Sequence, residues 1–215
     1  MKSILIIGLG RFGRHMARKF TEQGHSVLAI EKNSDTADNC IDIVKDIQIG
    51  DARSELFIDS LGINNFDLCV VAIGDDFLSS LEITVLLKDY GAKYIIARAT
   101  RDVYRNLLLR NGADYVVYAE RELAERLAVR FGSRNIYDYM RLGPDFEIFE
   151  VTTPPSWIGH SILEKQVRRR HNITILAAKN IRTGQISASL PPDYIFPEED
   201  CLIVLGSTGD VEKLR

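Results

Sequence analysis

The chain has little cysteine and no long apolar run. Its three cysteines, Cys40, Cys69 and Cys201, match neither a zinc-binding spacing nor a CxxC redox motif. Cys69 and Cys201 stand within short apolar segments, so we expect buried thiols in a reducing compartment. The apolar segment after Met1–Ser3 is too short for a signal peptide, and no other segment approaches the length of a membrane span.

An excess of charge is also missing. The formal net charge is −3, which gives no overall positive field for nucleic acid or an anionic membrane. A local exception is the basic run Arg168–Arg170. Because 46% of the residues are hydrophobic and 27% are charged, the composition is that of a globular protein with a proper core.

Short apolar segments alternate with amphipathic ones over the first 134 residues. Strands are predicted at Ile4–Ile7, Val27–Ile30, Asp46–Ile49, Leu68–Ile73, Tyr94–Ala97 and Tyr115–Val117, and helices at Arg11–Gln23, Ser54–Leu61, Phe77–Tyr90, Tyr104–Asn111 and Glu120–Phe131. Apolar strands separated by helices indicate a parallel sheet covered on both faces. We therefore predict an α/β domain over residues 1–134, a Rossmann-like doubly wound sheet.

The pattern changes after this point. Residues 135–215 are predicted to form a second, smaller α+β domain. Its expected elements are strands at 146–151, 173–178, 186–190 and 201–205 and a helix at 163–171. The strand at 146–151 alternates apolar and polar residues, as a strand with one buried face does.

The first predicted turn carries the motif GxGxxG as Gly8, Gly10 and Gly13, with Arg11 and Phe12 between them. It has the context that the motif requires, because it ends a strand and opens a helix. The glycines permit a tight turn, close approach of phosphate to the backbone, and close packing of helix on strand. The helix N-terminus then offers unpaired N–H groups to an anion.

Acidic residues end the next two strands. Glu31 follows the glycines at the distance expected of a carboxylate that binds both ribose hydroxyls, and it disfavours a 2′-phosphate even with Lys32 beside it. Asp51, next to Ala52, has two interpretations: it contacts the adenine amino group, or it caps the following helix.

The remaining strand ends complete the predicted nucleotide site with Ala72, Ile73, Gly74 and Arg98. Arg11 and Arg98 can both reach phosphates. The histidines, His15, His25, His160 and His171, do not follow any strand of the predicted sheet. A dehydrogenase needs a group that handles protons beside its substrate, so we expect a protein that binds a nucleotide without acting as an enzyme.

With these residues in place, the chain resembles the RCK (KTN) family, and within it the KtrA-type gating subunits of bacterial potassium transporters. The matching segments are Ile6–Gly13, Gly24–Glu31, Gly50–Ala52, Leu61–Ile63, Val70–Gly74, Gly112–Asp114 and Ile158–Ser161. The match covers nearly the whole chain. Relatives of the TrkA type usually carry two such units, and this chain carries one.

The resemblance implies a cytoplasmic homodimer that assembles into a ring beneath a membrane-embedded potassium channel subunit, with no membrane insertion of its own. Exchange of ATP and ADP would gate potassium flow, with Arg11 near the γ-phosphate. Glu120 would hold a divalent cation; alternatively, it is an acidic residue favoured at a helix start. An NAD(H)-dependent oxidoreductase and a nucleotide-sensing regulator of a different cation transporter stay open as alternatives.

The second domain resembles the RCK-C (TrkA-C) module, which implies a site for cyclic di-AMP between two subunits. The residues that the resemblance places there are Arg168, Arg169, His171, Ile173 and Pro191. The other interpretation of the basic run is a solvated helix C-terminus, where cations are favoured.

Overall fold

The computed structural model describes residues 1–133, 135–143 and 145–214, which form two compact units, Met1–Arg121 and Glu122–Arg215. The boundary between the units falls inside helix α6 (Ala119–Gly132), whereas the predicted boundary follows the end of this helix. Each unit is described by itself.

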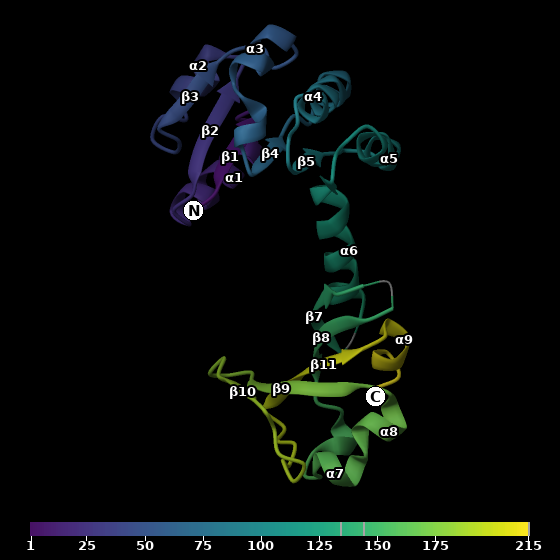
Figure 1. Cartoon of the computed structure of the whole chain (residues 1–215). Helices are drawn as coiled ribbons and strands as arrows, with labels where there is room; N and C mark the ends of the chain where they lie inside the picture. The colour runs from purple at the N-terminus through teal and green to yellow at the C-terminus, as the bar shows by residue number, and fades with distance from the viewer. Residues whose placement is uncertain (134, 144, 215) are drawn as a thin grey trace. The chain divides into compact units, whose positions relative to one another are not determined.

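Unit 1 is built on a six-stranded parallel sheet with the order β3-β2-β1-β4-β5-β6 (Figure 1). The strands are β1 (Ser3–Ile7), β2 (Ser26–Glu31), β3 (Asp46–Ile49), β4 (Leu68–Val71), β5 (Ile95–Arg98) and β6 (Tyr115–Val117). The helices are α1 (Arg11–Glu22), α2 (Ser34–Asp38), α3 (Glu55–Ser60), a 3₁₀ turn at Ile63–Asn65, α4 (Phe77–Asp89) and α5 (Asp102–Arg110). The predicted Rossmann-like doubly wound sheet is confirmed.

Two apolar cores cover the two faces of this sheet. Ile4 and Ile6 of β1 pack with α1 and the segment after α2, while Leu5 and Ile7 pack with α3, α4 and α5. All four side chains are at most 2% exposed. Because successive residues of a strand point to opposite faces, a strand buried on both sides reads as an unbroken apolar run.

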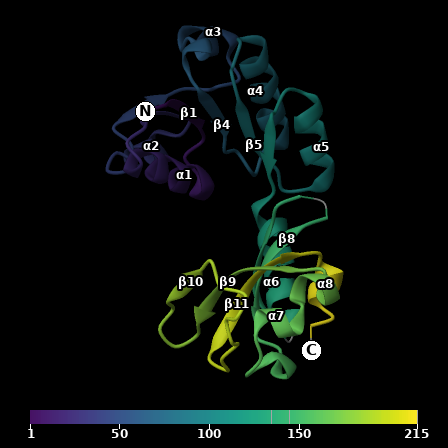
Figure 2. The ribbon, with the colours of Figure 1, turned by 60° about the horizontal axis from the view of Figure 1, so that its bottom comes forward.

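Unit 2 contains a five-stranded antiparallel sheet with the order β10-β9-β11-β8-β7. Figure 2 shows β10 on the left, at one edge of this sheet. The strands are β7 (Ile136–Arg141), β8 (Glu147–Thr152), β9 (Thr174–Asn180), β10 (Ile186–Ala188) and β11 (Asp200–Gly206), and the shorter helical elements are a 3₁₀ turn at Pro155–Trp157, α7 (Ile162–Lys165), α8 (Val167–His171) and α9 (Thr208–Val211). The smaller α+β domain is thus confirmed.

Several elements of unit 2 differ from the prediction. The strand β7, the 3₁₀ turn at Pro155–Trp157 and the helix α9 were not predicted. The single helix predicted over 163–171 is two helices, because Gln166 between them has a positive φ of 48°. A right-handed helix cannot continue through a left-handed residue.

The three cysteines are buried and unpaired. Burial raises the pKa of the Cys69 thiol to about 12 and that of the Cys201 thiol to about 11, since a thiolate is poorly solvated there. In the part of the chain that the structure describes, none of the helices combines the length and the apolar character that crossing a bilayer requires.

Candidate functional site

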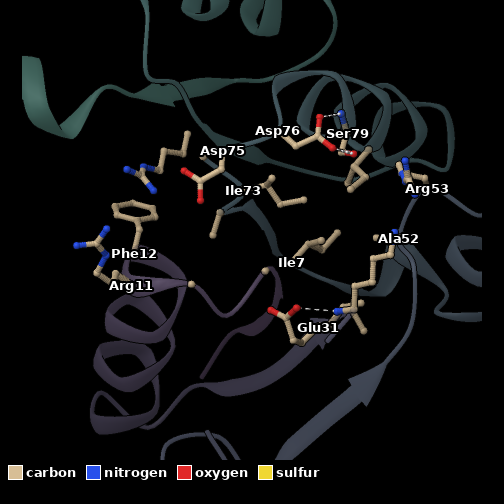
Figure 3. Close-up of a pocket in the computed structure, with 18 of the residues that line it drawn as sticks. Ile7, Arg11, Phe12, Glu31, Ala52, Arg53, Ile73, Asp75, Asp76 and Ser79 are labelled. Carbon is tan, nitrogen blue, oxygen red and sulfur yellow. Dashed lines mark hydrogen bonds between the residues drawn. The ribbon is translucent and has the colours of Figure 1, made fainter. Parts of the chain in front are cut away.

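A cavity of about 660 Å³ opens at the carboxyl ends of the parallel strands of unit 1. It brings together all of the predicted nucleotide-site residues except Gly13: Gly8, Gly10, Arg11, Phe12, Glu31, Lys32, Asp51, Ala52, Ala72, Ile73, Gly74 and Arg98. Figure 3 shows Arg11 and Phe12 on one side of the opening and Ala52 and Arg53 on the other, with Glu31 between. In open α/β sheets, this edge is where ligands bind.

The glycine loop has the geometry that phosphate binding requires. Gly8 has a φ of +94°, which side-chain-bearing residues rarely adopt. Gly13 lies beneath the loop, where an added Cβ would stand 1.9 Å from the Gly8 carbonyl oxygen. At the start of α1, no described side chain caps the helix and the first turn has no acidic residue. Its first N–H groups therefore remain available to an anion.

Glu31 binds the glycine loop as well as facing the cavity. One carboxylate oxygen accepts the Leu9 N–H at 2.7 Å, and the other accepts the N–H groups of Lys32 at 2.8 Å and Asn33 at 3.0 Å. A carboxylate has about four acceptor positions. One acceptor position remains open. The predicted contact with both ribose hydroxyls stays a prediction, and it requires one of the solvent-exposed N–H groups to be replaced.

Asp51 does not cap α3, because the Ser54 side chain does so by accepting the Phe57 N–H. The Asp51 carboxylate instead receives the forked Nε and Nη2 donors of Arg53 and the ammonium of Lys32. The hydrogen bond from Arg53 holds the pKa of Asp51 well below its usual range. Contact between Asp51 and an adenine amino group stays a prediction, and it requires one of these donors to move.

Arg98 and Glu120 form an ion pair on the cavity wall. The Arg98 Nη2 atom lies 2.6 Å from Glu120 Oε1. The Glu120 backbone N–H and the Arg98 guanidinium hold the pKa of Glu120 below its ordinary value. Among the described residues, no group of three or more histidine, cysteine, aspartate or glutamate side chains is placed to hold a metal ion. The predicted cation at Glu120 stays a prediction.

Sequence reasoning missed several cavity residues, namely His15, Arg53, Asp75, Asp76 and Ser79. His15 does not follow a strand, but it lies within α1 and is exposed at the edge of the cavity. Asp76 caps α4 by accepting the Ser79 N–H at 3.1 Å and the Ser79 hydroxyl at 2.6 Å. Asp76 stands two residues after Gly74, which was predicted at a strand end. This position was the signal that could have placed Asp76 at the cavity.

Unit 2 has a second cavity of about 610 Å³. Its lining includes the predicted residues Arg168, Arg169 and Ile173, together with Gln166, Thr174, Leu190 and Pro192. The predicted His171 is not part of this lining; its ring packs against Trp157 with 5.0 Å between centroids. Pro191 is also outside the lining, and its neighbour Pro192 takes its place.

Two family models match the chain. The model of the TrkA-N domain matches residues 4–119, which include the first cavity, and the model of the TrkA-C domain matches residues 146–215, which include the second. The chain is 32% identical to the Ktr system potassium uptake protein C of Bacillus subtilis, over all of this chain and 96% of the relative. The Ktr system potassium uptake protein A of the same organism is 31% identical over the same shares.

Solved structures share the fold. A structure titled GsuK Channel superposes with a TM-score of 0.72 at 19% identity, covering 99% of this chain and 39% of that one. A second, titled GsuK channel bound to NAD, superposes with a TM-score of 0.71 over 97% of this chain and 38% of that one. This chain thus spans less than half the length of these channel chains.

Proposed function

The chain belongs to the family of proteins that combine a TrkA-N domain with a TrkA-C domain, as its glycine motif and flanking segments predicted, and we propose on this premise that it is a regulatory, nucleotide-sensing subunit of a potassium-uptake system. The Ktr system potassium uptake proteins support a role in potassium uptake, because they match over the full length of this chain. The channel or transporter that it regulates is a separate, membrane-embedded subunit, and the protein acts in the cytoplasm at the inner face of the membrane.

The observation that carries the proposal is the convergence of the predicted nucleotide-site residues on one cavity. Glu31 at the end of β2 and Asp51 just after β3 stand where the adenosine would bind, and the uncapped N-terminus of α1 would receive the phosphates. Solved GsuK structures titled as bound to NAD and to ADP support nucleotide binding by this fold. We propose ATP and ADP as the ligands, since Arg11 within the glycine loop and Arg98 at the end of β5 both line the cavity and suit terminal phosphates.

The chain works by differential binding rather than by catalysis. A general base needs a pKa near neutrality. The hydrogen bond from Arg53 lowers the pKa of Asp51, and the backbone N–H of Glu120 together with Arg98 lowers the pKa of Glu120, so both cavity carboxylates are ionised at neutral pH. A ligand that favours one of two conformations shifts their populations without any chemical step.

Assembly with further copies of the chain is part of the proposal. On α6, Leu123, Leu127 and Phe131 are 56%, 41% and 76% exposed, and their spacing of four residues places them in one stripe. An exposed apolar stripe of this kind usually marks an interface. A two-fold homodimer is the commonest arrangement, and dimers of this chain would build the ring beneath the membrane subunit.

Calorimetric titration of ATP, ADP and NADH tests the function. We expect ATP to bind more tightly than NADH, and Arg11→Ala to reduce the preference for ATP over ADP while ADP binding is kept. Tighter binding of NADH, or turnover of NADH with a small carbonyl substrate, would favour the oxidoreductase instead. Loss of potassium uptake in cells that lack the gene distinguishes this role from control of another cation transporter.

The second cavity supports a second ligand of unit 2. Arg168 and Arg169 stand beside the apolar residues Leu163, Ile173 and Leu190 around one opening. Guanidinium groups donate paired hydrogen bonds to phosphodiesters, and apolar walls suit bases. We propose cyclic di-AMP at this site. Saturable binding that Arg169→Ala weakens is expected, and absence of binding at tens of micromolar in low salt would remove this ligand.

A further inference from the structure

The ion pair between Arg98 and Glu120 joins the nucleotide cavity to the first turn of α6. Arg98 is the last residue of β5, and Glu120 is the second residue of α6. The two side chains differ in freedom, because that of Arg98 is 20% exposed and that of Glu120 is 58% exposed. Glu120 is therefore the partner that can move away when the pair opens.

The surroundings of Arg98 hold its guanidinium at the cavity wall. The Phe12 ring centroid lies 5.8 Å from Arg98 Cζ, and a Cβ at Gly74 would stand 2.5 Å from Arg98 Nη1. The Nε atom is buried and has no hydrogen-bond partner in the part of the chain that the structure describes. A buried donor without a partner is costly, so an acceptor that reaches this guanidinium gains more than one at an open surface.

The order of the strands places Arg98 at the far end of the cavity from the adenosine. Glu31 ends β2, Asp51 lies two residues after the end of β3, the glycine loop follows β1, and Arg98 ends β5 beyond β4. A phosphate chain that starts at the ribose beside β2 and crosses the N-terminus of α1 therefore extends toward Arg98. Each added phosphate brings the negative charge closer to it.

We propose that Arg98 exchanges Glu120 for the terminal phosphate of the bound nucleotide, so that the first turn of α6 responds to the length of the phosphate chain. This inference rests on the proposed nucleotide site. Phosphate is the stronger partner because it carries more charge and can accept two N–H groups of the guanidinium, whereas Glu120 accepts one. Glu120 is then released, and the ion pair that joins β5 to α6 is lost.

Helix α6 can transmit the release of Glu120 from unit 1 to unit 2. Helix α6 begins in unit 1 at Ala119 and continues into unit 2 beyond Arg121. A change in its first turn is therefore a change in the segment that connects the two units.

The test measures the affinity of the full-length chain for AMP, ADP and ATP in EDTA, which removes any bound divalent cation. Glu120→Gln frees Arg98 in advance, so we expect it to raise ATP affinity about two- to fivefold, the range of an exposed ion pair, with no change for AMP. Glu122→Gln removes the same charge from the same helix and is expected to have less effect. Hydrogen exchange of amides 119–123 should rise with ATP and not with AMP.

If Glu120 acts only by repelling the phosphates of ATP, the effect of Glu120→Gln differs in a chain that also carries Arg98→Ala. Repulsion predicts that Glu120→Gln still raises ATP affinity in this background, whereas exchange predicts that the gain disappears. The inference is wrong if the gain persists there, if it is equal for AMP and ATP, or if no gain occurs. If the wild-type chain binds none of the three nucleotides, the proposed function itself has failed.

Discussion

Replacing Glu31 with alanine is expected to destabilise unit 1 before any nucleotide is added. Of the three N–H groups that its carboxylate accepts, those of Lys32 and Asn33 are exposed and can turn to water. The Leu9 N–H is different, because Leu9 is 0% exposed and its bond to Glu31 is 2.7 Å long. Loss of a hydrogen bond to a charged acceptor costs about 1.5–3 kcal/mol, which corresponds to a fall in Tm of about 4 °C for each kcal/mol.

Thermal unfolding followed by circular dichroism measures this effect, and calorimetry with ATP, ADP and NAD measures the loss of the ribose contact. Glu22→Ala is the matched control, since Glu22 pairs with Lys19 on an exposed turn of α1 and should leave affinity unchanged. An unchanged Tm for Glu31→Ala without ligand would refute the role of the Leu9 hydrogen bond. Unchanged affinity for all three nucleotides would refute the ribose assignment.

Three further substitutions probe other parts of the chain. Gly74→Ala places a Cβ 2.5 Å from Arg98 Nη1, so calorimetry should show weaker ATP binding with AMP binding kept. The first N–H of β1 and Lys93 lower the pKa of Asp67. The ionised Asp67 carboxylate therefore contributes to stability above about pH 4, and this contribution is lost as the pH falls further. Asp67→Asn should lower the Tm at pH 7, and its Tm should approach that of the wild type in acid. Gln166→Gly relieves a φ of 48° and should raise the stability of unit 2 to urea by up to about 1 kcal/mol.

The sheet of unit 1 was predictable because strands that are buried on both faces are apolar at every position. Segments such as Ile4–Ile7 and Leu68–Val71 are apolar at every position, and few other structures require that. The glycine motif then located the cavity, since its spacing serves one kind of turn. Glu31 stands at the known distance from this motif, and Arg98 ends another strand of the same parallel sheet, so both could be placed at the same edge without coordinates.

Elements that depend on tertiary contacts have a weaker pattern in the sequence and were harder to predict. The edge strand β7 has polar residues such as Asp138 and Arg141, and its pairing with β8 defines it more than any apolar run does. Helix α2 has five residues and depends on the Asn33 side chain at its N-cap. The Arg53 fork on Asp51 and the bond from Leu9 to Glu31 depend on side-chain directions that spacing alone does not contain.

The buried cysteines give each unit its own internal reporter of opening. Cys40 and Cys69 lie in unit 1 and Cys201 in unit 2, and burial raises the pKa of all three thiols. Thiolate is the reactive form, so an alkylating reagent can modify these residues only when the surrounding core opens. The rate at which each thiol is alkylated therefore measures the local free energy of opening. Intact-mass spectrometry and peptide mapping of one alkylated sample would compare the two units with each other. A second sample that contains nucleotide would show whether the ligand changes either rate.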